Sequence, residues 1–207
     1  MSIFKKSFKS KPSAPRVIFN RFLLGFVLTL TLTGQTLYAQ QSDADAKKLA
    51  EIRSKAEKGE AEAQVEFGRI LSQGKFGVTK DEVEAVKWFR KAAEQNFFSA
   101  QNCLGFCYLN GIGVEKDEQE GLKWYRKAAE QNFAPAQRSV GEGYFKGIGV
   151  EKNMIEAYKW FLLAAAQGDE DAKSRVRHLE KKLKKDQIAE VKKQVAEWTQ
   201  QHKQVTN

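Results

Sequence analysis

Apolar side chains recur along the chain at the spacing of one helix face, and the same arrangement appears three times. In the first stretch, Val86, Phe89, Ala92 and Ala93 fall on one side of a helix with 3.6 residues per turn. The matching residues of the other two stretches are Leu122, Tyr125, Ala128 and Ala129, then Tyr158, Phe161, Ala164 and Ala165. With Trp88, Trp124 and Trp160 they keep a period of 36 residues. This period predicts a stacked array of repeats.

A second apolar pattern precedes each of these helices, so that each repeat predicts a pair of helices. It starts at Ala63, Ala100 and Ala136 and places apolar or small residues four, five and eight positions later. Capping pairs mark the start of the second helix in each repeat. They are Asp81 with Glu84, Asp117 with Glu120, and Asn153 with Glu156. Asn96, Asn132 and Gly168 follow its last turn, where a left-handed cap needs Asn or Gly.

The order of these residues resembles the Sel1-like repeat, a relative of the tetratricopeptide repeat. Its pattern, A-x-x-x-[apolar]-G-x-x-[YL]-x-x-G-x-G-V-x-x-[DN]-x-x-x-A-x-x-W-[FY]-x-x-A-A-x-[QN], is matched by residues 100–133 and nearly as well by residues 136–168. The first copy departs through an extra loop residue in 74–81 and through Leu71 in place of Tyr. The resemblance implies an all-α fold, an α-solenoid of antiparallel helix pairs in a right-handed superhelix. It also implies an adaptor or scaffold role in protein complexes.

The repeat pattern divides the chain into eight segments. They are a signal peptide at 1–39, a disordered leader at 40–46, an N-terminal half-repeat helix at 47–62, three full repeats at 63–99, 100–135 and 136–171, a C-terminal half-repeat with a capping helix at 172–200, and a flexible tail at 201–207. A stacked array needs terminal elements with one polar side, and the last helix suits that role. Its lysines would alternatively hold it on an anionic membrane surface.

The first 39 residues have the layout of a secretory signal peptide. Six basic residues precede the apolar run 22–32, and the sequence Leu37-Tyr38-Ala39 favours cleavage after Ala39. An uncleaved membrane anchor is the alternative, although the run is short and interrupted by threonines. We therefore expect an exported protein, periplasmic or secreted, in a bacterial cell envelope.

Removal of this segment changes the meaning of the net charge of +9. Residues 1–39 contain six basic and no acidic side chains, which leaves 29 basic against 26 acidic. Within that remainder, residues 173–207 have 10 basic against 4 acidic, whereas residues 40–172 have 19 against 22. The basic character belongs to the targeting segment and the last helix, so a nucleic-acid partner is not expected.

Few residues in the sequence suggest catalysis or metal binding. Cys103 and Cys107 lie four residues apart on one helix, a spacing near the outer limit for a disulfide, and their redox state stays open. The two histidines, His178 and His202, lie far along the chain and do not complete a metal site with them. The favoured interpretation is that the thiols are buried or line a groove. We expect no enzymatic activity, no cofactor and no metal.

The candidate binding surface consists of positions where the copies differ on the outward side of the first helices. They are Val65, Arg69, Gln73, Asn102, Phe106, Asn110, Arg138, Glu142 and Lys146. The resemblance places this side on the concave face, where helical solenoids bind ligands, and Phe106 is a candidate anchor for a partner. The alternative is that these positions vary because they are solvated and unused. The repeated aromatic pairs beginning at Trp88 are expected to pack in the core and not to form a sugar-stacking surface.

These observations predict an exported scaffold or adaptor that binds a protein or peptide partner through the concave face. A monomer is expected, with membrane contact limited to the signal peptide. The alternative function is a cell-envelope accessory factor that binds peptidoglycan or another glycan.

Overall fold

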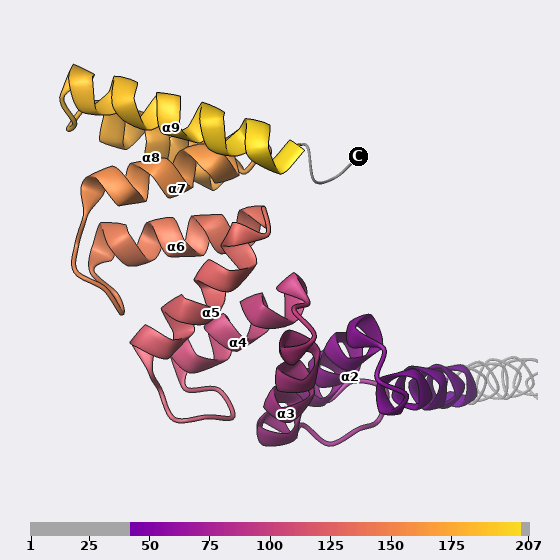
Figure 1. Cartoon of the computed structure of the whole chain (residues 1–207). Coiled ribbons are helices and arrows are strands. Elements are labelled where there is room, and N and C mark those ends of the chain that lie inside the picture. The colour runs from indigo at the N-terminus through magenta and orange to yellow at the C-terminus, as the bar shows by residue number, and fades with distance from the viewer. Residues whose placement is uncertain (1–41, 204–207) are drawn as a thin grey trace, which may run out of the picture. The chain divides into compact units, whose positions relative to one another are not determined.

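The computed structural model describes residues 42–203, which are helical throughout apart from short connections (Figure 1). Residues 42–57 form the first of these helices. The helices that follow are α2 (Ala61–Gln73), α3 (Glu82–Glu94), α4 (Phe98–Asn110), α5 (Glu118–Glu130), α6 (Ala134–Lys146), α7 (Met154–Ala166), α8 (Glu170–Glu180) and α9 (Lys185–Lys203). The predicted signal peptide and its cleavage site at Ala39 lie outside the described residues. Among the described helices, none is long and apolar enough to cross a membrane.

Each helix packs mainly against the next one along the chain. The antiparallel pairs are α2 with α3, α4 with α5, and α6 with α7, and the second helix of each pair also contacts the first helix of the next. Glycine permits the close approach within a pair. A methyl group added to Gly105 of α4 would come within 2.7 Å of the Tyr125 ring of α5, and Gly141 stands in the same relation to Phe161. The described residues thus confirm an all-α solenoid of stacked helix pairs.

The predicted N-caps are present, but the capping boxes are only half formed. The Asp81 side chain accepts a hydrogen bond from the Glu84 backbone N–H at 2.9 Å, and Asp117 does the same for Glu120. The glutamate does not reach back, because the Asp81 N–H already donates to the Leu71 carbonyl at 2.9 Å. The Glu84 carboxylate instead pairs with Lys87 at 2.8 Å. At the other ends, Asn96 and Asn132 adopt φ angles of 61° and 63°, as the left-handed caps require.

Side-chain amides form three hydrogen-bonded groups along the array, two of which connect successive repeats, and we call the three groups together the amide ladder. Its members are Gln64, Gln95, Asn96, Gln101, Gln131, Asn132, Gln137 and Gln167. The Gln131 Nε2 donates to Gln101 Oε1 at 2.7 Å, and the Gln167 Nε2 donates to Gln137 Oε1 at 2.8 Å. Because buried amides are costly without partners, these bonds explain how Gln101 and Gln137 are accommodated in the core.

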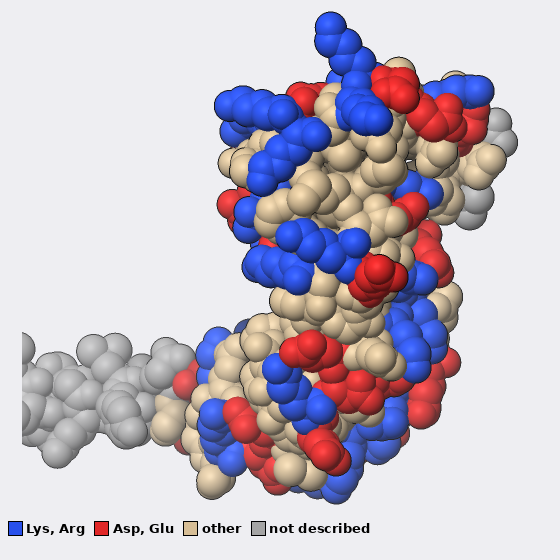
Figure 2. All heavy atoms as spheres, turned by 90° about the vertical axis from the view of Figure 1, so that its left-hand side faces the viewer, with Lys and Arg blue, Asp and Glu red and all other residues tan. Residues whose placement is uncertain are grey.

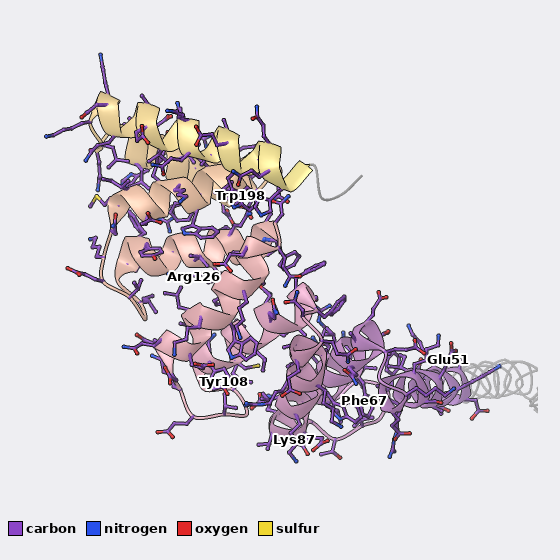
Figure 3. The ribbon with its side chains drawn as sticks, in the orientation of Figure 1. Glu51, Phe67, Lys87, Tyr108, Arg126 and Trp198 are labelled. Atoms are coloured by element: carbon purple, nitrogen blue, oxygen red, sulfur yellow. The ribbon has the colours of Figure 1, made fainter. Side chains whose placement is uncertain are left out.

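A second polar link between repeats joins an arginine to a tyrosine. The Arg90 Nη2 of α3 donates to the Tyr108 hydroxyl of α4 at 2.7 Å. The Arg126 Nη2 of α5 donates to the Tyr144 hydroxyl of α6 at 2.5 Å, and Figure 3 labels Tyr108 and Arg126 on their respective helices. The first repeat, which follows the helix at 42–57, has Leu71 at the corresponding position and therefore lacks this link.

The C-terminal helix α9 closes the described array by packing on α7. Val191 of α9 is buried, and Trp198 packs against the cluster that contains Trp160 and Leu163 of α7 (Figure 3). The Tyr158 hydroxyl donates to Glu180 Oε1 at 3.0 Å, and Lys192 of α9 pairs with the same oxygen at 2.9 Å. One carboxylate of α8 therefore joins α7 to α9.

Basic side chains are unevenly distributed over the surface. On the face shown in Figure 2, Lys and Arg gather over the C-terminal end of the array, whereas both signs alternate further down. The corner between α8 and α9 contributes the exposed residues Lys181, Lys182, Lys184 and Lys185. The excess of basic residues that the sequence shows in 173–207 thus lies at the C-terminal end of the array.

Two segment predictions differ from the structure. Residues 42–46, expected within a disordered leader, belong to the helix that runs to residue 57, and the two alanines of this stretch favour helix. Residues 201–203, expected within a flexible tail, form the last turn of α9. The first helices of the repeats also begin two residues before the predicted boundaries, for example at Phe98 and not at Ala100.

Candidate functional site

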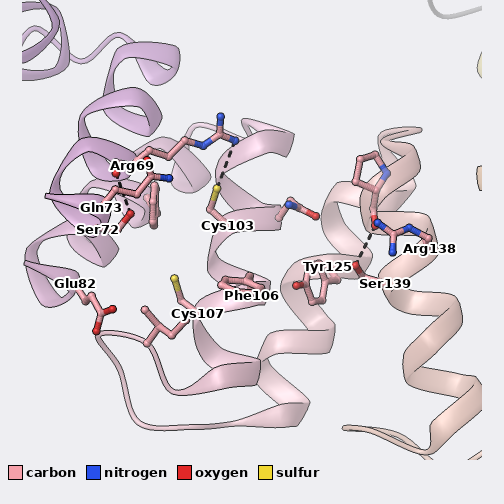
Figure 4. Close-up of a pocket in the computed structure, with 14 residues that line it drawn as sticks. Arg69, Ser72, Gln73, Glu82, Cys103, Phe106, Cys107, Tyr125, Arg138 and Ser139 are labelled. Carbon is pink, nitrogen blue, oxygen red and sulfur yellow. Dashed lines mark hydrogen bonds between the residues drawn. The ribbon is translucent and has the colours of Figure 1, made fainter. Parts of the chain in front are cut away.

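A pocket of about 420 Å³ lies over α2, α4 and α6, the first helices of the three repeats (Figure 4). We call it the α4 pocket because α4 forms its middle wall. Five of the predicted binding residues line it, namely Arg69, Gln73, Asn102, Phe106 and Arg138. These five residues were predicted from three separate repeats, and the fold places them around one pocket.

The centre of the α4 pocket is apolar. Phe106 is 51% exposed, although most large apolar side chains of the described array are buried. Cys107, Ile112 and the buried Tyr125 ring lie beside it in the lining. An exposed aromatic ring over an apolar hollow is typical of a position that a partner covers.

Charged groups occupy the edges of this pocket. Figure 4 shows Arg69 of α2 near Cys103 at one end, Glu82 near Cys107 at another, and Arg138 on the α6 side. The Arg69 Nη2 donates to Ser99 Oγ at 3.2 Å and to Cys103 Sγ at 3.8 Å, both of them neutral partners. Arg69 forms no ion pair with any carboxylate of the described residues, so its charge faces the pocket unneutralised.

The other two charges at the pocket edges are paired. Arg138 Nε lies 3.0 Å from Asp169 Oδ2, and its Nη1 lies 3.7 Å from Asp171 Oδ2. The Glu82 carboxylate pairs with Lys80 Nζ at 2.7 Å. Arg69 therefore differs from both in having an unmatched charge.

The two thiols are free, and their surroundings keep them protonated. Burial raises the pKa of the Cys103 thiol, and the nearby Arg69 opposes this shift only in part. Burial, followed by the proximity of Cys103 and Glu82, raises the pKa of Cys107 to about 12. Because the thiolate is the reactive form, neither sulfur is activated as a nucleophile at neutral pH. Within residues 42–203, no cluster of three or more His, Cys, Asp or Glu could hold a metal ion.

Two other predicted residues belong to a separate polar hollow. Glu142 and Lys146 line it together with Arg138, and the hollow has a volume of about 580 Å³. Glu142 is held between Lys146 Nζ at 2.7 Å and Arg175 Nε at 2.6 Å. These charges satisfy one another, so this hollow lacks the unmatched group found in the α4 pocket.

The prediction for Val65 is wrong, and Asn110 lies outside both hollows. Val65 is only 3% exposed because the helix at 42–57 covers it, with Ile52 and Ala56 in the same apolar cluster. Asn110 is exposed and its Nδ2 donates to the Phe106 carbonyl at 2.8 Å, which ties it to its own helix. The core role is confirmed for most of the repeated aromatic residues, whereas Trp124 is only partly buried. The buried ones are Trp88, Phe89, Tyr125, Trp160 and Phe161.

Sequence reasoning missed several walls of the α4 pocket. Glu82, Ile112, Tyr125 and Ser139 all line it, and they come from a helix start, a loop, a second helix and the inner side of α6. The amide ladder was missed as well, although its signal was present in the sequence. Glutamine follows the first alanine of each repeat at positions 64, 101 and 137.

Comparison with known proteins identifies the repeats. The model of the Sel1 repeat matches residues 61–97, 99–133 and 134–169, just over half of the chain. The chain belongs to the Sel1 repeat family. Sel1 repeat proteins are generally non-catalytic scaffolds that mediate protein–protein interaction. Comparison with curated proteins found no significant match.

Solved structures show the same fold. A Sel1 repeat protein from Oxalobacter formigenes is 41% identical, with a TM-score of 0.58 over 64% of this chain and 98% of that one. The protective antigen c5321 of uropathogenic Escherichia coli is 29% identical, with a TM-score of 0.56 over 76% of this chain but 41% of that one. Helicobacter pylori cysteine rich protein B is 26% identical, with a TM-score of 0.51 over 64% and 95%. This Sel1 repeat chain has only two cysteines.

Proposed function

We propose that this Sel1 repeat protein is an exported scaffold that binds a segment of a partner protein in the α4 pocket. The carrying observation is that one pocket brings together five residues at positions where the repeats differ, and these residues come from the first helices of all three repeats. The exposed ring of Phe106 supplies an apolar anchor in its centre. Anchors of this kind carry a large part of the binding energy in protein interfaces.

A photo-crosslinking experiment in intact cells tests this proposal. A photoreactive phenylalanine analogue is placed at Phe106 in the full chain, and in a second strain at Phe98. Both are exposed phenylalanines on α4, but Phe98 lies outside the pocket lining and contacts the Phe133 ring, with ring centroids 4.9 Å apart. We expect a specific protein adduct at Phe106 that is absent at Phe98.

The outcome also decides between protein and glycan ligands. Mass spectrometry of the adduct should identify partner peptides. An excess of Phe106→Ala protein should leave the adduct in place. Loss of the adduct under this competition would show that the pocket is not the binding site. A glycan adduct at Phe106 would contradict the proposal in favour of the cell-wall alternative. Equal adducts at Phe106 and Phe98 would show that the pocket is not the docking site.

Export is part of the same proposal and rests on the basic and apolar segments of residues 1–39. N-terminal sequencing of the protein isolated from the cell envelope should begin at Gln40. A chain that retains Met1 would show that cleavage after Ala39 does not occur.

A further inference from the structure

We propose that the α4 pocket recognises a peptide segment in which a large apolar side chain stands close to an aspartate or glutamate, whose carboxylate binds Arg69. This inference rests on the proposed function and specifies the chemistry of the partner. It follows from the charges and the apolar surface around the pocket.

The first observation is the unmatched guanidinium of Arg69. Its hydrogen bonds go to Ser99 Oγ and Cys103 Sγ, and neither group carries a negative charge at neutral pH. A guanidinium presents several N–H donors in a planar fork that suits a carboxylate. A ligand carboxylate would therefore add to the bonds of Arg69 without displacing an internal ion pair.

The second observation is that the other charged residues of the pocket do not attract a ligand carboxylate, so that Arg69 alone determines where it binds. Arg138 is already neutralised by Asp169 and Asp171, so it offers little additional attraction. Glu82 at the lower end is likewise neutralised, by Lys80 at 2.7 Å, so it offers a ligand carboxylate no attraction (Figure 4). Together these groups favour one acidic side chain, located at the Arg69 end.

The third observation is the apolar centre beside Arg69. Phe106, Cys107 and Ile112 line it, and a cavity of about 420 Å³ falls within the range of pockets that bind ligands. A peptide supplies an apolar side chain that suits this hollow.

Selection from a displayed library of random nonapeptides on the full chain tests the inference. We expect the enriched peptides to combine a large apolar residue with a nearby Asp or Glu. Replacing that acid by its amide in a selected peptide should weaken binding about 10-fold or more, measured by fluorescence anisotropy. Arg69→Glu should weaken binding of the acidic peptide similarly and should favour a peptide in which Lys replaces the acid.

The matched control is Arg53→Glu, which makes the same charge change at an exposed arginine outside the pocket lining, whose Nε lies 2.8 Å from Glu57 Oε1. It should leave peptide binding unchanged. Arg69→Gln serves as a second variant should the charge reversal disturb folding, which circular dichroism would reveal. Because Phe106 is exposed, Phe106→Ala should fold normally and lose the apolar preference.

Three results are decisive. Charge-swapped binding by Arg69→Glu would support the inference. Peptides that require Phe106 but show no acidic preference, or keep it in Arg69→Glu, would overturn the inference while the proposed function stands. No enriched peptides, or peptides indifferent to both Phe106 and Arg69, would overturn the proposed function and the inference with it.

Discussion

At the scale of single residues, the second glycine of the inter-helix loop in the second and third repeats fixes how closely successive segments approach. Gly113 has a φ of +67°, and a Cβ added to it would meet the Glu82 carbonyl oxygen at 2.1 Å. Gly149 has the same φ, and a Cβ there would meet the Glu118 carbonyl oxygen at 2.2 Å. The loop of one repeat thus lies directly on the start of the second helix of the previous repeat, where no other residue fits.

Gly113→Ala should therefore destabilise the protein more than Gly77→Ala. Both glycines have a left-handed backbone, which costs a substituted alanine about 1–2 kcal/mol, but nothing lies within 4 Å of a Cβ at Gly77. The clash at Gly113 should add about 1–3 kcal/mol. Urea unfolding monitored by circular dichroism measures both free energies, and equal losses would show that the loop moves away at little cost.

At the scale of elements, the helices and their caps could be predicted because their signals are local. Asp81 needs only the backbone three residues ahead, and Asn96 only its own conformation. The walls of the α4 pocket could not be predicted in the same way. Tyr125 lies on the second helix of its repeat, and its ring packs in the core and also lines the pocket. Val65 was wrongly predicted to be exposed, because the helix that precedes the first repeat covers it. Those outcomes depend on how helices stack, which periodicity alone does not specify.

The amide ladder is the element that links repeats, and Gln137 is its most buried described member at 0% exposure. Gln137→Leu should destabilise the protein by about 1–3 kcal/mol, because the Gln167 Nε2 and the Ala129 carbonyl lose a partner. The matched control is Gln119→Leu, at an exposed position of α5. Thermal and urea unfolding compare the two, and an unchanged stability of Gln137→Leu would mean that the ladder contributes nothing net.

At the scale of the whole molecule, the carboxylate of Glu180 connects the last repeat to α9. Hydrogen bonds from Lys192 and then Tyr158 hold the pKa of Glu180 below its ordinary value. A carboxyl group whose pKa is lowered on folding stabilises the protein at pH above its unfolded-state pKa. This stabilisation is lost as the pH falls through the folded-state pKa.

The free energy of unfolding of wild type should therefore exceed that of Glu180→Gln at neutral pH and approach it in acid. Urea titrations at a series of pH values from neutral to acidic measure this difference. Glu197→Gln, at an exposed position of α9, should behave like wild type throughout. A difference between wild type and Glu180→Gln that stays constant with pH would contradict the role of the ionised carboxylate.

The amide ladder has a consequence for the behaviour of the array in different solutions. Its members are neutral at every pH at which the protein is folded, and hydrogen bonds between neutral amides do not depend on ionic strength. The joints between repeats should therefore keep their geometry as salt concentration changes. The attraction of the exposed Arg69 for an anion is screened by salt, with a range of about 8 Å at physiological ionic strength. Salt should thus tune how strongly the pocket holds an acidic ligand without altering the pocket itself.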